Sequence, residues 1–177
     1  MLTRTSKNKI NKILEENSKW KILDIGCGYR AHHKASTIAD VQDFSNYYKN
    51  KKFIQIKEKK LPFEDNEFDF VIASHVIEHV NDFQFFIKEI ERISSKGYIE
   101  LPTRLADNLV FENKTDHVWW FFFDDINNEL IVSEKKNLIE LCNKRYNSVK
   151  GFLTKSERNY YKNNLKKIVK SKMISIR

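Results

Sequence analysis

The fold is decided at residues 20–28, which read Trp20-Lys21-Ile22-Leu23-Asp24-Ile25-Gly26-Cys27-Gly28. The apolar run before the first glycine predicts a strand that is buried on both faces. Gly26 and Gly28 allow a tight turn and a close backbone approach to a ligand. Asp24 can hold loop amides or a ligand ammonium group. A plain strand-to-loop turn has the same appearance, so the rest of the chain must decide between the two interpretations.

Further strands follow this one along the chain. Apolar, β-branched or aromatic runs predict four of them, at residues 37–41, 53–56, 68–73 and 98–101. The helical spacing of apolar residues predicts helices over residues 6–17, with Ser6 as the cap, and from about 82 to 93. Strands that alternate with helices or crossovers predict an α/β fold with a mostly parallel sheet and helices on both faces.

The connection after the glycine turn is shortened. Only eight residues separate Gly28 from Thr37, whereas a parallel crossover usually takes about a dozen or more. We therefore expect the loop 29–36, which contains His32 and His33, in place of a crossover helix.

After residue 103 the pattern becomes that of an antiparallel hairpin. Residues 118–123 and 129–132 flank the polar stretch 124–128, which predicts two strands joined by a five-residue loop. A helix is expected from about 134 to 145, and a basic helix from about 156 to 172. The chain then divides into a main domain, residues 1–150, and a basic C-terminal helix or tail, residues 151–177.

Charge is distributed unevenly along the 177 residues. The formal net charge is +8, and residues 151–177, with six Lys, two Arg and one Glu, carry +7 of it. This tail predicts either a helix packed on the body with its lysines in solvent, or an amphipathic helix in peripheral contact with an anionic membrane. The nearly neutral body makes nucleic acid the less favoured partner. The aromatic hairpin could also be buried against a second subunit, so an oligomer is an open alternative.

Two absences bear on the compartment. No apolar run approaches the roughly 20 residues of a membrane span, and residues 1–7 lead into a polar stretch without a signal-peptide core. We therefore expect a cytoplasmic protein. Its two cysteines, Cys27 and Cys142, lack metal-type spacing and are expected to be reduced thiols.

Polar side chains follow the ends of the predicted strands. The carboxyl ends of parallel strands meet at one edge, where open α/β sheets bind ligands. Asp40 can accept both hydroxyls of a ribose there, and the third glycine needed for a dinucleotide pyrophosphate is missing, which favours a nucleoside cofactor without phosphates. The candidate cofactor-binding residues are Asp24, Gly26, Cys27, Gly28, Asp40, Val41, Glu58, Lys59, Ser74 and His75.

Three motifs carry a resemblance to a known family. They are residues 23–28 (Leu-Asp-Ile-Gly-Cys-Gly), 61–71 (Leu-Pro-Phe-Glu-Asp-Asn-Glu-Phe-Asp-Phe-Val) and 75–80 (His-Val-Ile-Glu-His-Val). Over residues 18–103 the chain resembles the class I S-adenosylmethionine (SAM)-dependent methyltransferases, in particular the group with methyltransferase type 11 domains. The resemblance implies a Rossmann-like sheet and SAM as the cofactor.

The same resemblance implies roles for single residues. It places Asp24, Gly26 and Gly28 around the methionine part of SAM, and Asp40 on the ribose. The family often has Asp at the adenine position, where this chain has Lys57. The adenine amine would therefore use Glu58 or a backbone carbonyl.

Histidines are the candidates for chemistry. Methyl transfer from a sulfonium is an in-line displacement that needs positioning, and a general base helps when the acceptor is a hydroxyl. His75 follows the fourth strand and is expected at the cofactor edge. His117, with Asp116 before it to orient the ring, is expected near the acceptor, although a plain loop pair is the alternative. His75 and His79 have the spacing of metal ligands, but no third ligand is evident, so no metal is expected.

The resulting prediction is SAM-dependent methyl transfer to an oxygen or nitrogen of a small-molecule or glycan/glycolipid-type acceptor. One alternative is a degenerate, non-catalytic SAM-binding module, indicated by the short loop after Gly28 and by Lys57. Another is a nucleic-acid-associated methyltransferase that uses the tail to grip phosphates. Residues 73–76 read Ala-Ser-His-Val and not Asn/Asp-Pro-Pro-aromatic, which counts against methylation of exocyclic amino groups on bases.

Overall fold

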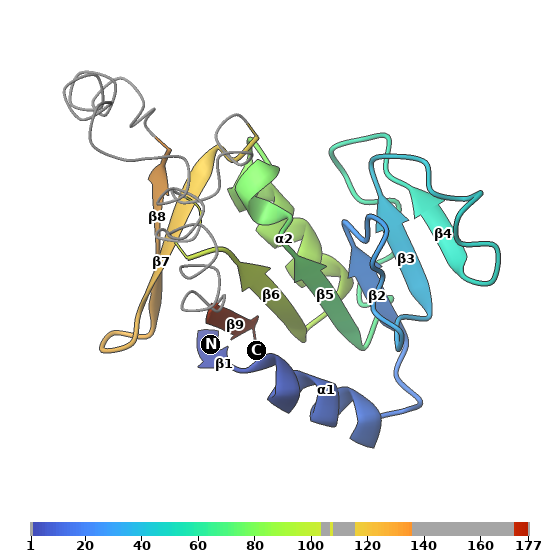
Figure 1. Ribbon diagram of the computed structural model, residues 1–177, viewed down its shortest axis with the longest axis horizontal. Helices are drawn as coiled ribbons and strands as arrows, with labels where there is room; N and C mark the ends of the chain where they lie inside the picture. Colours follow the sequence, from blue (N-terminus) through green and yellow to red (C-terminus); the bar gives the residue numbers. More distant parts are fainter. Residues whose placement is uncertain (1, 104–106, 108–115, 136–171, 177) are drawn as a thin grey trace, which may run out of the picture.

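The computed structural model describes residues 2–103, 107, 116–135 and 172–176. Its main sheet has seven strands in the order β1-β9-β6-β5-β2-β3-β4 (Figure 1). Five neighbouring strands are parallel. They are the five that the sequence predicts: β2 (Ile22–Ile25), β3 (Thr37–Asp40), β4 (Lys52–Gln55), β5 (Phe70–Ser74) and β6 (Gly97–Leu101). The mostly parallel, Rossmann-like sheet is therefore confirmed.

Two short antiparallel strands extend the sheet beyond β6. β9 (Lys172–Ile176) lies between β6 and β1 (Leu2–Thr5) and pairs with both. The sequence pattern predicts neither strand, because each is short and finds its partner at the far end of the chain. The predicted basic helix lies outside the described residues except for Lys172, which begins β9 and not a helical turn. The proposed boundary at residue 150 stays a prediction.

One helix covers the first face of the sheet. α1 (Lys7–Glu16) begins after the predicted cap Ser6, whose side chain accepts a hydrogen bond from the Lys9 amide at 3.3 Å. Ile10 and Leu14 are the buried residues of α1. They belong to a cluster that includes Ile22, Ile38, Phe70 and Ile72 of the sheet.

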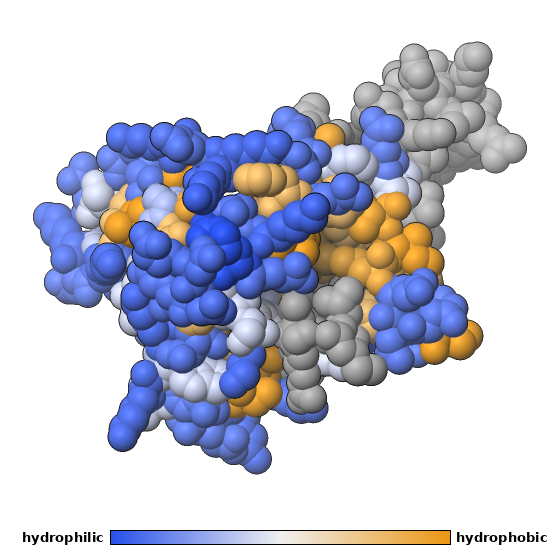
Figure 2. All heavy atoms as spheres, turned by 180° about the vertical axis from the view of Figure 1, so that it is seen from behind, coloured by the Kyte–Doolittle hydropathy of each residue, from blue (hydrophilic) through white to orange (hydrophobic). Residues whose placement is uncertain are grey.

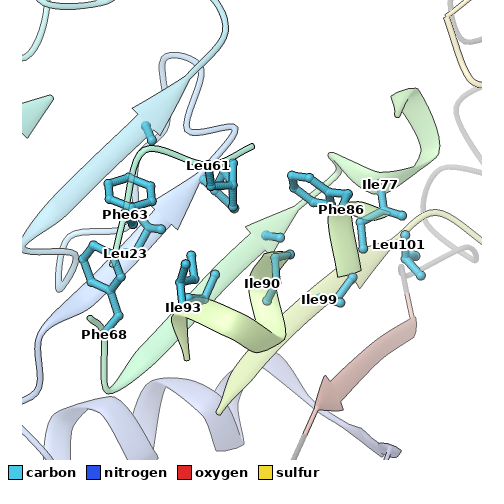
Figure 3. Packing of buried hydrophobic residues seen from close by; sticks show 14 of the residues in the cluster. Leu23, Leu61, Phe63, Phe68, Ile77, Phe86, Ile90, Ile93, Ile99 and Leu101 are labelled. Atoms are coloured by element: carbon cyan, nitrogen blue, oxygen red, sulfur yellow. The ribbon is translucent and has the colours of Figure 1, made fainter. Parts of the chain in front are cut away.

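A second helix covers the opposite face (Figure 3). α2 (Phe83–Ile93) is capped by Asp82, which accepts a hydrogen bond from the Phe85 amide at 3.0 Å. Its apolar side packs on the sheet in a cluster that contains Phe86, Ile90, Ile93, Leu23, Ile99 and Leu101. Full burial of an apolar side chain of this size contributes about 1.5–3 kcal/mol. The two clusters therefore fix the parallel strands between the helices, as predicted, and with them the strand ends.

A loop replaces the crossover helix between β2 and β3. Residues 29–36 contain turns and no helix, which confirms the prediction. The loop closes where the Ser36 amide donates to the Ile22 carbonyl at 2.9 Å, and the Lys51 ammonium donates to the Ala35 carbonyl at 2.8 Å. Within the described residues, no helix combines the length and the apolar character needed to cross a membrane.

The predicted hairpin is present as β7 (Trp119–Asp124) and β8 (Glu129–Glu134). Asp124 pairs with Glu129, so the loop comprises residues 125–128 and is shorter than expected. Glu134 belongs to β8 and not to the helix expected from about 134 to 145, whose remaining residues, apart from Lys135, lie outside the described part. Figure 2 shows apolar surface on the side of the molecule where the hairpin lies. Phe122 and Ile131 are exposed large apolar residues of the hairpin strands. Association through this surface stays a prediction.

Candidate active site

A pocket opens at the carboxyl ends of β2, β5 and β6, next to α1. Its volume is about 390 Å³. Five of the predicted site residues line it together: Asp24, Gly26, Cys27, Ser74 and His75. The other lining residues carry no sequence signal that predicts them: Lys7, Ile10, Asn11, Arg30, His32, Ile72, Tyr98 and Glu100. α1 and the loop 29–36 thus supply walls of the pocket, and these walls cannot be predicted from the positions of the strand ends.

The two glycines of the turn have different surroundings. Both have positive φ angles, +70° at Gly26 and +47° at Gly28. A Cβ at Gly26 would lie 2.3 Å from Cγ2 of Val76, so the residue after His75 packs directly on the turn. A Cβ at Gly28 would meet nothing within 4 Å. Gly26 is therefore required by packing within the protein, whereas Gly28 leaves space that a ligand can use.

Asp24 is a buried carboxylate at the wall of the pocket. Its Oδ2 accepts a hydrogen bond from the His32 amide at 2.6 Å. Burial raises the pKa of Asp24 to about 6 in spite of this bond and of nearby Lys51 and Lys7. Burial penalises the charged form of Asp24. A ligand cation beside it would stabilise the carboxylate by pairing with it, and would thereby lower this pKa again.

The ring of His32 fixes the loop that replaces the crossover helix. Its Nδ1 accepts a hydrogen bond from the Lys34 amide at 3.3 Å, which leaves Nε2 to donate to Oδ1 of Asn11 in α1 at 3.2 Å. Burial lowers the pKa of His32 to about 4, so the ring is neutral near pH 7. The loop is thereby joined to α1 across the wall of the pocket.

Asp40 organises the turn from the neighbouring strand. Its Oδ2 accepts a hydrogen bond from the Gly28 amide at 2.9 Å, and its Oδ1 accepts one from the Gln42 amide at 3.0 Å. The side chain is buried but does not line the pocket. Asp40 therefore ties the end of β3 to the glycine turn, and each of its oxygens keeps a further lone pair for a ligand.

The remaining predicted cofactor residues lie on open surface. Val41, Glu58 and Lys59 are exposed and do not line the pocket. Lys59 pairs with Oδ2 of Asp82 at 2.6 Å, at the start of α2. The structure thus brings the candidates at β2 and β5 together, and leaves those after β3 and β4 outside the pocket.

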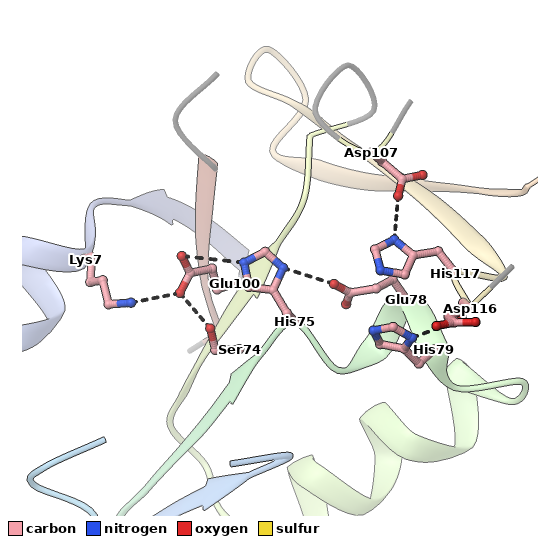
Figure 4. Close-up of polar contacts among 9 residues, drawn as sticks. All are labelled: Lys7, Ser74, His75, Glu78, His79, Glu100, Asp107, Asp116 and His117. Carbon is pink, nitrogen blue, oxygen red and sulfur yellow. Dashed lines mark hydrogen bonds and ion pairs between the residues drawn. The ribbon is translucent and has the colours of Figure 1, made fainter. Parts of the chain in front are cut away.

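His75 stands between two carboxylates at the end of β5 (Figure 4). Its Nδ1 lies 3.2 Å from Oε1 of Glu78, and its Nε2 lies 3.9 Å from Oε1 of Glu100. The hydrogen bond to Glu78 raises the pKa of His75 above its usual value. The backbone is left-handed here, with φ +57°, and the amide donates to the Glu100 carbonyl at 2.9 Å. His75 lines the pocket, at the strand end where the sequence places it, and its role there stays a prediction.

Glu100 is a functional candidate that the sequence analysis misses. Although it is buried, its Oε2 accepts a hydrogen bond from Ser74 Oγ at 2.7 Å and lies 3.3 Å from the Lys7 ammonium. A glutamate inside a predicted strand indicates nothing by itself, because its partners come from β5 and α1. Nearby, the buried Tyr98 hydroxyl has no hydrogen-bond partner and lines the same pocket, so it is available to a ligand.

His117 lies behind Glu78 and does not line the pocket. Its Nδ1 contacts Oδ1 of Asp107 at 2.5 Å, and both side chains are buried. The structure corrects the predicted partner of His117. The carboxylate that contacts and orients its ring is Asp107, whereas the backbone carbonyl of Asp116 accepts a hydrogen bond from His79 Nδ1 at 3.0 Å. Adjacency in sequence misleads here because the chain turns between Asp116 and His117.

Comparison with known proteins agrees with the fold and the turn. Residues 23–99 match the family model described as a methyltransferase domain. A solved SAM-dependent methyltransferase from Mesorhizobium loti is similar in fold, with a TM-score of 0.51 and 12% identity over 96% of this chain and 94% of that one. An uncharacterized protein of Methanocaldococcus jannaschii, MJ0638, is 33% identical over 115 residues, 57% of this chain. The chain spans about half the length of that relative, 48%.

The sheet and the glycine turn agree with the family match. Over residues 23–99 the chain is similar to methyltransferase domains, and its mostly parallel sheet is consistent with that similarity.

Proposed function

We propose that this protein transfers the methyl group of SAM to an oxygen or nitrogen of a small-molecule or glycan-type acceptor. The observation that carries the proposal is the buried carboxylate of Asp24, which lies beside the glycine turn in the wall of the pocket. A buried charge is costly unless it is paired. The ammonium group on the methionine part of SAM is a suitable partner for it.

The nucleoside part of SAM would extend from the turn toward β3 and β4. The lone pairs that Asp40 keeps can accept the ribose hydroxyls, and the open space at Gly28 leaves room for the sugar. The adenine would lie over the open surface of Val41, Glu58 and Lys59, all exposed. Tyr29, which is exposed and contacts the rings of Phe44 and Tyr47, offers an aromatic face beside the same turn.

The acceptor would occupy the part of the pocket near His75 and Glu100. SAM, when bound, would supply the methyl group: the acceptor oxygen or nitrogen would bond to the methyl carbon as the carbon–sulfur bond breaks, and S-adenosylhomocysteine would leave. His75 accepts the proton of the acceptor at Nε2, since Nδ1 contacts Glu78. His117, one layer behind Glu78, acts as a positioning residue in this scheme and makes no contact with the acceptor.

Calorimetry with SAM and with S-adenosylhomocysteine tests the cofactor part of the proposal. Saturable binding is expected, and Asp24→Asn should weaken it at least about tenfold, since hydrogen bonds to charged groups contribute about 1.5–3 kcal/mol. His33→Ala is the matched control, because His33 is exposed and does not line the pocket. A folded protein that binds neither ligand would overturn the proposal.

One observation favours a second candidate function, a SAM-binding module without turnover. Both carboxylate oxygens of Asp40 already hold backbone amides, and Glu58 and Lys59 lie outside the pocket. Release of S-adenosylhomocysteine in the presence of a panel of hydroxyl and amine acceptors separates the two functions. The peripheral membrane contact and the phosphate grip proposed for residues 151–177 concern residues that lie mostly outside the described part.

A further inference from the structure

Three potential metal ligands meet behind the pocket, where the chain passes from β5 into the hairpin (Figure 4). Glu78 and His79 belong to the short helix η1 (Ile77–His79), and His117 precedes β7. One ligand atom from each lies within 4.8 Å of the other two. The Val118 amide donates to the Glu78 carbonyl at 2.7 Å, which holds His117 beside η1.

Hydrogen bonds orient both histidine rings in the same way. His79 contacts the Asp116 carbonyl through Nδ1 at 3.0 Å, and His117 contacts Oδ1 of Asp107 through Nδ1 at 2.5 Å. A carbonyl can only accept, so Nδ1 of His79 carries the proton and Nε2 keeps its lone pair. A carboxylate partner has the same effect on His117. Metal-binding histidines are typically held by such contacts at the ring nitrogen that does not bind the ion.

The carboxylate behind His117 is itself held firmly. Oδ2 of Asp107 accepts hydrogen bonds from the indole of Trp120 and the ammonium of Lys135, both at 2.8 Å. Asp107 therefore offers its other oxygen to His117 in a fixed direction. Such support keeps the imidazole in one orientation with Nε2 available. At metal sites, a carboxylate that accepts from the other ring nitrogen also makes the histidine a more basic ligand.

Glu78 supplies an independent observation that points to a cation. Its side chain is 0% exposed, its Oε1 contacts His75, and its Oε2 is buried without a hydrogen-bond partner. An ionised oxygen would need a donor here, and a protonated one would need an acceptor, but neither lies within reach. Leaving a buried carboxylate oxygen unsatisfied costs stability. A metal ion at the meeting point of the three ligands removes that cost.

We propose that Glu78, His79 and His117 form a binding site for a divalent transition metal ion. Two imidazole nitrogens and one carboxylate oxygen suit zinc, iron or manganese better than magnesium or calcium, which take oxygen ligands. Three protein ligands leave at least one coordination position for a water or an acceptor oxygen. The exposed ring of His79 provides access from solvent, and the contact of His75 with Glu78 links the site to the pocket.

The probe for this site is Zn²⁺ alone, titrated by calorimetry into the full chain after chelator treatment and in the absence of SAM. One equivalent should bind and should raise the melting temperature, because an ion that binds only the native state stabilises it. His79→Ala should abolish this binding, and Asp107→Asn should weaken it by about 10–100-fold. His33→Ala, an exposed histidine outside the cluster, should bind as the wild type does.

Two outcomes would overturn the proposal. One is the absence of saturable Zn²⁺ binding by the folded wild-type protein. The other is binding that survives in His79→Ala, which would place the ion elsewhere. Since His79 is exposed, its replacement leaves the folded core intact, and a circular dichroism spectrum of each variant verifies this. Both measurements are independent of SAM, so failure of the proposed methyl transfer would leave this result unaffected.

Discussion

The carboxyl ends of the parallel strands form two unlike halves of one sheet edge, one enclosed and one open. At β2, β5 and β6 the edge is enclosed by α1 and the loop 29–36, and buried carboxylates line a pocket. At β3 and β4 the same edge is open, and Val41, Glu58 and Lys59 point to exposed surface. Both halves belong to one parallel sheet, so the difference comes from what is packed over the strand ends and not from the strands.

The contrast shows which parts of the candidate site depend on the fold alone. The glycine turn and Asp24 are fixed by the sheet, since the Gly26 amide donates to the Ala39 carbonyl of β3 at 2.7 Å. Val41, Glu58 and Lys59 of the open half are exposed, so fewer contacts of the fold depend on them. We therefore expect substitutions in the enclosed half to have larger effects than substitutions in the open half.

The largest effect is expected at Gly26. The substitution Gly26→Ala adds a Cβ 2.3 Å from Cγ2 of Val76 at a φ of +70°, and should lower the free energy of unfolding by about 3 kcal/mol. Gly28→Ala has the unfavourable φ without the clash, and should cost about 1 kcal/mol. Urea denaturation measures both. The double variant Gly26→Ala/Val76→Ala should recover part of the loss, and equal losses at the two glycines would contradict this account.

A smaller effect is expected at the boundary between the halves. Asp40→Ala removes the acceptor of the Gly28 and Gln42 amides, and should weaken SAM binding by about 2 kcal/mol. Lys59→Ala, in the open half, should change it by less than about 0.5 kcal/mol, as is usual for exposed positions. Calorimetry with SAM compares the two. A loss at Lys59 as large as that at Asp40 would show that the open half binds the cofactor equally strongly.

The smallest effect concerns pH. Burial raises the pKa of Asp24 from 3.8 to about 6, so its ionisation opposes folding, and this group makes the fold less stable as pH rises from about 4 to about 6. Pairing with the SAM ammonium requires the carboxylate. SAM affinity should therefore fall as pH drops below about 6, with a slope approaching tenfold per pH unit. Calorimetry between pH 5 and 7 measures this slope, which Asp24→Asn should remove; a flat wild-type profile would exclude the pairing.

Most of the parallel sheet could be predicted because each strand carries its own signal. Strands β2 and β5 are mostly apolar and β-branched, and such short segments predict buried strands without reference to partners. β1 and β9 could not be predicted, since their pairing joins Leu2 to Ile176 and depends on contacts between the far ends of the chain. Local pattern carries no information about such a pairing.

The residues of the candidate site also fall into those that local sequence predicts and those that depend on distant contacts. Asp24 lies near the end of β2 and His75 follows β5, so their position in the fold brings both to the pocket. Glu78 lies between an isoleucine and a histidine, and nothing in its neighbours along the chain predicts that it is fully buried. In the sequence, His79 has metal-ligand spacing only with His75, and no third ligand is evident, so no metal is expected. The structure instead pairs His79 with Glu78 and with His117, a residue from a distant segment.

The left-handed backbone at His75 has an evolutionary consequence. Glycine or asparagine adopts this conformation with less strain than histidine does, so selection for stability alone would favour a different residue. An imidazole in this conformation carries a local cost in stability, which replacement by glycine or asparagine would remove. Screens for thermostable variants should therefore recover substitutions at His75 early, and those variants would be stable proteins with impaired activity.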